Sequence, residues 1–501
     1  MKTKGKSGVM DMTQGNMAML ILSFALPLML GNVFQQFYTV ADTAIVGKIL
    51  GVDALAALGT VESINWLVLG TIQGITQGFG ILVSQQFGAK KEEALQETIF
   101  HASFLAVVAA ILFTVGILIG LPGLVGILQV PVDIRPICLD YLYVLFGGIP
   151  LMMLYNFTAA MLRAFGDSKT PLTACVIAAL FNIALDLYFI LELGWGVKGA
   201  ALATVIAQTL ASAYCLWKLC RIEVLTEKRK AAKWRLHAGL CGKLIYLGLP
   251  MAFQNLVIAI GGMIVQTVVN SFGVAFIAGY TATCKLYGIL EVAATSYGFA
   301  MVTYTGQNLG AGKTDRIKEG TRIGVLIGVL TSFVITGLMF LFGRNILGLF
   351  ISADAAQGSQ AAVVAWRFLR IMSSFLWVLY ILHIVRSVIQ GMGNTVIPLV
   401  SGIFEFIMRT GATLILPVLF GENGILFAEV LAWMGADLVL IPGYLYMRKK
   451  LLSADRTKVM FKAQFEVLRK RKTSPTAGGS DRKLLCRRAG FFSAPVLLVV
   501  A

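Results

Sequence analysis

Long apolar runs recur along the whole chain, and they constrain its fold more than any other feature. A helix needs roughly 20 apolar residues to cross the hydrocarbon core of a bilayer. Charged residues make up only 13% of the chain, whereas about a quarter is usual in soluble domains. The sequence therefore predicts an all-α polytopic membrane protein with about twelve transmembrane helices. The runs lie near residues 18–46, 54–84, 98–120, 136–160, 171–192, 197–219, 244–269, 274–305, 321–342, 363–390, 396–419 and 424–447.

Basic residues gather in alternate connections between these runs. Lysine and arginine accumulate in the cytoplasmic loops of membrane proteins, so we expect both termini on the cytoplasmic side. The net charge of +17 is then a signal of topology, and we expect no nucleic-acid partner. The basic connections are residues 2–6, 90–91, 163–169, 218–243, 313–318 and 448–450.

The two halves of the chain carry the same short motifs in the same order. SQQFGAKK at 84–91 matches GQNLGAGK at 306–313, and LRAFGDSKTPL at 162–172 matches IQGMGNTVIPL at 389–399. Such a repeat, with an even number of spans in each copy, predicts two six-helix halves of the same orientation. We therefore expect a cytoplasmic N-terminus (1–16), a first six-helix bundle (17–220), a basic cytoplasmic linker (221–243), a second six-helix bundle (244–448) and a basic cytoplasmic tail without fixed structure (449–501).

Proline and glycine mark two features inside the spans. Pro27 and Pro250 occupy matching places in the first span of each half. A proline ring removes a helical hydrogen bond and bends the helix, so both residues are candidate hinges. Gly70, Gly74 and Gly78 form a small-residue face against which a neighbouring helix can pack closely.

The sequence contains no pattern typical of an enzyme or of a structural metal site. Its seven cysteines form no CxxC pair, and its three histidines join no cysteine or acidic cluster. We therefore expect neither a structural metal nor a cofactor. A phosphate-binding loop is also absent, which argues against direct use of ATP.

Two carboxylates interrupt apolar runs of the first half. Asp42 belongs to FYTVADTAIVG at 37–47, and Asp186 belongs to NIALD at 182–186. An ionised side chain in hydrocarbon costs at least about 2.5 kcal/mol, so intramembrane acids usually face a cavity and have a function. The alternative is that the first span ends before Asp42, which would then lie in headgroup water.

Helical spacing favours a common site for these acids. Asn182 and Asp186 are four residues apart and share a helix face, and the helical rise places Thr204 and Asp42 at a similar level of the bundle. We expect an oxygen-rich cation site, which can hold Na⁺ or exchange a proton. Its members are Asp42, Asn182, Asp186 and Thr204.

Charged residues of the second half fall at different places in the repeat. Glu405 and Arg409 are four residues apart and are expected to form a buried ion pair. No carboxylate matches Asp42, so the cation site is assigned to the first half. A weaker candidate for a polar cavity consists of Lys285, Glu291, Glu405, Arg409 and Glu429.

These motifs resemble those of the MATE (multidrug and toxic compound extrusion) family. The resemblance covers residues 15 to about 448, and it includes SQQFGAKK, LRAFGDSKTP, NIALD with the following GAALAT, and a pattern carried by Pro27, Asp42 and Gly47. It is greatest to the DinF-like bacterial branch, which has an acidic cation site in its N-terminal half. The likeness implies the fold of the MATE/MOP superfamily and a cation site formed by Asp42, Tyr38, Asn182, Asp186 and Thr204.

The same resemblance implies a function. It predicts a secondary active exporter of amphipathic organic cations in the bacterial cytoplasmic membrane, driven by Na⁺ or H⁺ and needing no other cofactor. A single chain holds both halves, so a monomer is expected to function.

Three other functions are open at this point. A flippase for lipid-linked oligosaccharides needs a cationic cavity, for which Arg386 and Arg409 are few. An intramembrane aspartyl protease needs a GxGD motif, and the nearest match is AFGD at 164–167. A passive channel leaves the intramembrane acids unexplained.

Overall fold

Helices form all the regular structure in the described part of the chain. The computed structural model describes residues 9–127, 130–226, 235–348 and 356–472. The elements are α1 (Met17–Leu50), α2 (Val52–Gly88), α3 (Glu92–Ile127), α4 (Arg135–Gly147), α5 (Ile149–Ala164), α6 (Lys169–Leu187), the π-helix η1 (Tyr188–Glu192), α7 (Gly196–Leu219), α8 (Glu223–Thr226), α9 (Ala238–Val269), α10 (Val274–Gly310), α11 (Thr314–Leu347), α12 (Ala356–Ser374), α13 (Leu376–Gly391), α14 (Val396–Phe420), the 3₁₀-helix η2 (Glu422–Phe427) and α15 (Ala428–Lys472).

Each of the twelve predicted runs corresponds to a helix or to a bent pair of helices. Within the described residues, nine helices are long and apolar enough to cross a membrane, and two bent pairs, α4 with α5 and α12 with α13, add two more. The remaining run, 274–305, corresponds to α10, which has 37 residues and carries many polar side chains. The predicted fold class is confirmed.

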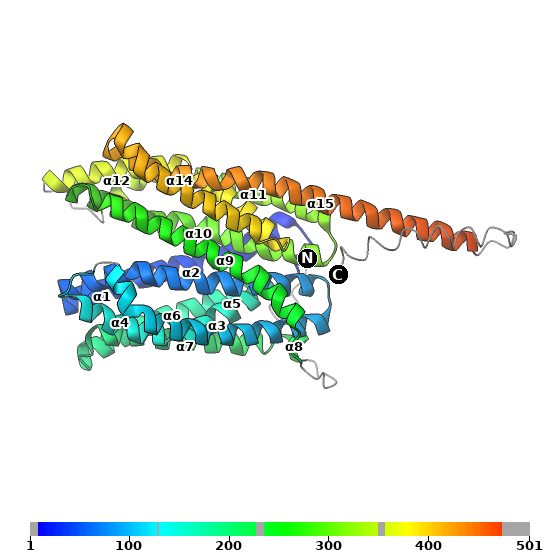
Figure 1. The fold of residues 1–501 in the computed structure, drawn as a ribbon, viewed down its shortest axis with the longest axis horizontal. Helices are drawn as coiled ribbons and strands as arrows, with labels where there is room; N and C mark the ends of the chain where they lie inside the picture. The colour runs from blue at the N-terminus through cyan, green and yellow to red at the C-terminus, as the bar shows by residue number, and fades with distance from the viewer. Residues whose placement is uncertain (1–8, 128–129, 227–234, 349–355, 473–501) are drawn as a thin grey trace. The chain divides into compact units, whose positions relative to one another are not determined.

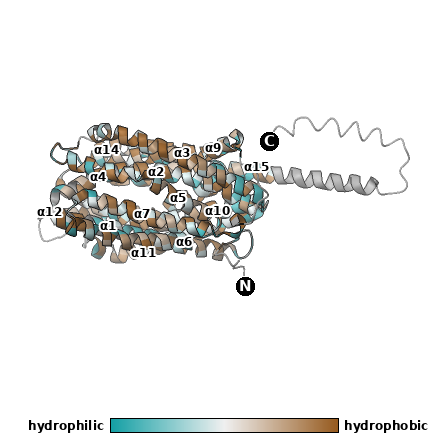
Figure 2. Cartoon of the chain, turned by 90° about the horizontal axis from the view of Figure 1, so that it is seen from below, coloured by the Kyte–Doolittle hydropathy of each residue, from teal (hydrophilic) through white to brown (hydrophobic). Residues whose placement is uncertain are grey.

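Apolar side chains cover much of the surface of the bundle. Ile119, Leu341 and Val418 are each at least 75% exposed, and Figure 2 shows hydrophobic residues along the helices with hydrophilic ones gathered toward their ends. The most apolar stretch of α11 has only 11% of its residues buried, against 72% for α2. Because so large an apolar surface is unfavourable in water, α11 faces lipid, whereas α2 lies in the interior.

The repeat is visible in the backbone as well as in the motifs. Gly166 and Gly393 occupy matching positions and have φ angles of 86° and 85°, while Lys90 and its match Gly312 have φ angles of 54° and 69°. Positive φ ends each helix with a tight turn. The α4–α5 and α12–α13 pairs, which also match, are both bent by 49°.

The first two helices of each half form the contact between the halves. Helix α2 packs against α9 and α10, and α1 packs against α10. Figure 1 shows α2 and α9 side by side along the middle of the bundle, with α3 to α7 beyond α2 and α11 to α14 on the opposite side. Pro27 and Pro250 lie inside α1 and α9, and their role as hinges stays a prediction.

The contact between α2 and α9 is tightest at one end. We call this the basic end: it is where α1 begins, α2 and α10 end, and the lysine-rich connections lie. A Cβ atom added at Gly78 or Gly74 would overlap the backbone of α9, whereas one added at Gly70 would make an ordinary contact of 3.5 Å with Asn255. The predicted close approach at these glycines is therefore present, and the two helices diverge away from the basic end.

The segment before α1 also joins the halves at the basic end. The Met12 amide donates to Gln307 Oε1 at 2.8 Å, and Lys313 Nζ donates to the Thr13 carbonyl at 2.7 Å. Gln307 in turn donates through Nε2 to the Ala164 carbonyl at 3.0 Å. Residues 12–13 are thus held between the end of α5 and the second half.

The chain divides into two units at residue 447. Residues Met1–Met447 form one unit and Arg448–Ala501 the other. Helix α15 is helical as far as Lys472, beyond the point where the sequence places the start of the tail. The rest of the expected tail, residues 473–501, and most of the expected linker, residues 227–234, lie outside the described residues.

Candidate functional site

Asp42 and Asp186 lie next to each other inside the first half. Asp42 is on α1 and is 9% exposed, while Asp186 is at the end of α6 and is fully buried. Their carboxyl groups are within hydrogen-bonding reach of each other. Within the described residues, the Oδ1 atom of each has no hydrogen-bond partner, although buried polar atoms are nearly always paired. Two free carboxylate oxygens in one buried place provide ligands for a cation.

Asn182 and Thr204 complete the site on the neighbouring helices. Asn182 is 1% exposed and donates through Nδ2 to Thr204 Oγ1 at 3.3 Å. In the opposite orientation of the amide, Nδ2 donates to Asp186 Oδ2 at 3.3 Å and the amide oxygen accepts from the Thr204 backbone amide, also at 3.3 Å. Both orientations connect α6 to α7 beside the two carboxyl groups. The four residues that helical spacing predicted to converge do so.

A short π-helix begins directly after Asp186. Helix α6 ends at Leu187, and η1 continues from Tyr188 to Glu192. The wider π-turn rotates the side chains that follow it, and such turns are frequent at functional sites. The segment is held by Phe189, whose ring stacks on Trp195 with centroids 5.2 Å apart. Nothing in the sequence pattern distinguishes this turn from an α-helix.

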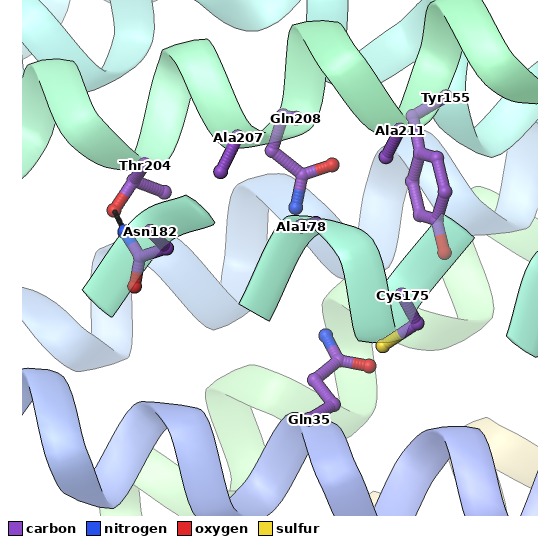
Figure 3. A pocket seen from close by; sticks show the side chains of 9 residues that line it. All are labelled: Gln35, Tyr155, Cys175, Ala178, Asn182, Thr204, Ala207, Gln208 and Ala211. Carbon is purple, nitrogen blue, oxygen red and sulfur yellow. Dashed lines mark hydrogen bonds between the residues drawn. The ribbon is translucent and has the colours of Figure 1, made fainter. Parts of the chain in front are cut away.

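A pocket extends from Asn182 and Thr204 between α1, α5, α6 and α7. Figure 3 shows the hydrogen-bonded Asn182 and Thr204 at one end and Tyr155 with Cys175 at the other. Ala178, Ala207 and Ala211 line the space between them, where their small side chains leave room. Gln208 Oε1 is buried there and has no hydrogen-bond partner in the described part of the chain, and Gln35 reaches the pocket from α1 (Figure 3).

The expected fifth member of the site is Tyr38. Its backbone belongs to α1, but its side chain is outside the part of the chain that the structure describes. Its role remains a prediction from the resemblance.

The polar cavity expected from five charged residues of the second half stays a prediction. Glu405, Arg409 and Glu429 lie together: Arg409 Nη2 is 3.1 Å from Glu405 Oε1 and 2.8 Å from Glu429 Oε2. The predicted Glu405–Arg409 pair is present. The other two residues have different partners: Glu291 contacts His383 at 3.3 Å, and Lys285 contacts Glu62 of the first half at 3.2 Å.

Arg386 also belongs to the cluster of Glu405, Arg409 and Glu429, although the sequence analysis did not place it there. Its Nη2 donates to Glu405 Oε2 at 2.7 Å, and in one orientation of its amide Gln254 accepts from Arg386 Nε at 3.1 Å. Arg386 lies on α13 and Glu405 on α14, so no spacing rule relates them. Glu405 is thus neutralised by two guanidinium groups, whereas no ion pair to a described Lys or Arg reaches Asp42 or Asp186.

Arg409→Ala is expected to destabilise the folded chain strongly. The change leaves Glu429 without its guanidinium partner inside the second half, and removing one partner of a buried ion pair costs about 3–5 kcal/mol. The measurement is the melting temperature in detergent. The control is Lys198→Ala, because Lys198 and Asp140 form a pair with side chains 56% and 50% exposed, and such pairs contribute about 0–1 kcal/mol. Equal melting temperatures for the two variants would contradict the structural role of the cluster.

Glu62 is another charged residue that sequence reasoning missed. It lies in the apolar run of α2, so the rule that identified Asp42, an acid inside a predicted span, applies to it equally. Its partner Lys285 is on α10, and that contact depends on how the halves pack.

Comparisons with known proteins give the family. The MatE family model matches the chain twice, over residues 27–188 and 250–413. The probable multidrug resistance protein YpnP of Bacillus subtilis (strain 168) is 28% identical over 423 residues, which cover 83% of this chain and 92% of that protein. The probable multidrug resistance protein YoeA of the same organism is 28% identical over 440 residues, covering 84% and 92%.

The fold comparison agrees. A solved structure described as the outward-facing conformation of a multidrug resistance MATE family transporter of the MOP superfamily matches with a TM-score of 0.81 at 21% identity, covering 90% of this chain and 99% of that one. The two family matches fall one in each half and together cover most of the chain. The chain therefore belongs to the MATE family, whose members are membrane transporters and not enzymes.

Proposed function

We propose that the chain is a secondary active multidrug exporter that exchanges organic cations for Na⁺ or H⁺. The observation that carries this proposal is the pair of buried carboxyl groups, Asp42 and Asp186, each with an oxygen that has no partner among the described residues. A bound cation supplies the charge that these oxygens lack. The names of YpnP and YoeA, which refer to multidrug resistance, support the substrate class.

The site lies where ion binding can act on the position of a helix. Asp42 is on α1, which packs against α10 of the second half, and Asp186 is on α6. Two carboxylates repel each other when both are ionised, and a cation between them removes the repulsion. Ion binding therefore favours the arrangement in which α1 and α6 are close. Coupling follows if substrate favours the other arrangement, because each ligand shifts the equilibrium only by its difference in affinity for the two states.

The membrane orientation belongs to the same proposal. The basic end carries Lys90, Lys91 and Lys313, so we assign it to the cytoplasmic side of the bacterial cytoplasmic membrane. The tight contacts of Gly74 and Gly78 then close the cytoplasmic side, and the halves open outward. One chain supplies both halves, and we propose that it functions as a monomer.

The flippase alternative is less well supported. A pyrophosphate group requires free cationic side chains, and both arginines considered for that role are occupied. Arg386 is paired with Glu405, and Arg409 with Glu405 and Glu429.

Gradient-driven uptake tests the exporter. Everted vesicles containing the chain are clamped at zero membrane potential and given ethidium outside, with either high Na⁺ or low pH imposed in the lumen. We expect ethidium to accumulate with one of the two gradients and not with the other, because one ion leaves the lumen as the dye enters. Uptake that is independent of both gradients would contradict antiport.

A further inference from the structure

Helix α2 presents a ridge toward the second half that is closed at the basic end and open beyond it. Residues 62, 66, 70, 74 and 78 are spaced by four and share this ridge. Gly78 and Gly74 lie against the backbone of α9, and Gly70 accepts a hydrogen bond at its carbonyl from Asn255 Nδ2 at 2.7 Å. At the far end of the ridge, Glu62 meets Lys285 of α10.

Trp66 therefore faces the second half, yet it is exposed. It stands on the ridge between Gly70 and Glu62, both of which contact the second half, and 61% of its surface is accessible. Helix α2 packs against α1, α3, α4, α5, α9 and α10 (Figure 1), and of its other described residues only Asp53, Gly59 and Gln73 are exposed. The exposure of Trp66 thus marks an opening between the halves, beyond the point where α2 and α9 separate.

A carboxylate and an ammonium group bridge this opening. Lys285 Nζ lies 3.2 Å from both Glu62 Oε1 and Glu62 Oε2. The Lys285 side chain is 52% exposed and the Glu62 side chain 40% exposed. Gln36 of α1 lies beside Gly288, one turn along α10 from Lys285. An ion pair with this exposure is weak, so a ligand with suitable charges can replace it.

We propose that the Glu62–Lys285 pair and Trp66 form a binding site for zwitterionic aromatic substrates. A ligand that carries an ammonium group and a carboxylate satisfies Glu62 and Lys285 together. A simple organic cation pairs with Glu62 but brings its charge next to Lys285, which disfavours it. The Trp66 indole provides a flat apolar surface on which an aromatic cation stacks. The inference rests on the proposed export function and narrows its substrate class.

Two dyes that differ by one methyl group test the site. Rhodamine 110 has a free carboxylate and is a zwitterion at neutral pH, while rhodamine 123 is its methyl ester and a cation. Their binding to the purified chain in detergent is measured by fluorescence anisotropy. We expect the wild type to bind rhodamine 110 at least about tenfold more tightly than rhodamine 123. Equal binding, or preference for the ester, overturns the proposal.

Variants of the pair separate the two charges. Lys285→Ala is expected to weaken rhodamine 110 and to tighten rhodamine 123, because the ammonium group that attracts one and repels the other is gone. Glu62→Gln and Trp66→Leu are expected to weaken both dyes. The double variant Glu62→Lys with Lys285→Glu exchanges the two charges, and we expect it to restore the preference for rhodamine 110. An ion pair with a purely structural role would not require this preference. A preference that survives Lys285→Ala overturns the site.

Controls keep this test distinct from that of the exporter. Lys198→Ala removes an exposed lysine on α7 that is paired with Asp140, and it should leave both dyes unchanged. Each variant is checked by its melting temperature, so that a misfolded protein is not counted. The binding measurement uses no ion gradient. Failure of gradient-driven uptake would therefore overturn antiport alone, and failure of the dye preference would overturn this site alone.

Discussion

Asp42→Asn and Asp186→Asn are each expected to reduce gradient-driven uptake of an organic cation to that of vesicles without the protein. Asparagine has nearly the same shape as aspartate but cannot carry a charge or release a proton. The ion then no longer distinguishes the two arrangements of α1 and α6. A coupling free energy of about 1–3 kcal/mol, or about 5- to 150-fold in affinity, is lost.

The measurement is the initial rate of ethidium uptake under whichever gradient drives the wild type. Thr204→Val serves as an intermediate case, because it removes one hydroxyl that contacts Asn182 and leaves both carboxylates in place. Asp140→Asn is the control, since Asp140 is half exposed and belongs to a different pair. Wild-type rates in both asparagine variants would sink the proposed cation site.

Gly78→Leu is expected to prevent the halves from closing at the basic end. Even a Cβ atom at this position overlaps the backbone of Gly248 on α9. Overpacking of this kind typically costs about 1–3 kcal/mol, and the cost falls on the arrangement with the basic end closed. A population shift of about 5- to 150-fold toward the opposite arrangement follows, because 1.4 kcal/mol corresponds to a factor of ten.

Labelling of a single thiol reports this shift. In a chain freed of its own cysteines, Trp66→Cys places a thiol in the opening between the halves, where a membrane-impermeant maleimide reaches it from the side opposite the basic end. We expect slower labelling when Gly78→Leu is added. The matched control is Gly116→Leu on α3, where an added Cβ atom meets no other atom within 4 Å. If the leucine variant does not fold, Gly74→Ala gives a smaller overlap at the same contact, and unchanged labelling in a folded variant would contradict the assignment.

The sequence predicted those features of the fold and the site that follow from the hydropathy and the spacing within each helix. Hydropathy located the twelve runs, each of which is a helix or a bent pair of helices, because a span must match the thickness of the bilayer. Spacing of four residues placed Asn182 and Asp186 on one face, and Thr204 followed from helical rise. The structure brings these three together with Asp42. The repeat fixed the order of elements in both halves.

Two ion pairs between helices were not predicted from the sequence. Arg386 joins Glu405 from a different helix, and Lys285 meets Glu62 across the two halves. Both pairs depend on the crossing of helices, which no local spacing encodes. The π-turn after Asp186 likewise depends on packing, and its residues have ordinary helical preferences.

Helix α1 links the cation site of the first half to a contact with the second half. The N-terminal end of α1 lies a few residues after Met12 and Thr13, which form hydrogen bonds with Gln307 and Lys313 of the second half. Asp42 lies 25 residues along from Met17, a distance of about 38 Å at the helical rise. Ion binding at Asp42 therefore acts on α1, and the other end of this helix is held by hydrogen bonds to the second half. A tag joined directly to residue 9 would adjoin that contact, so the choice of tagged terminus becomes part of any transport experiment on this chain.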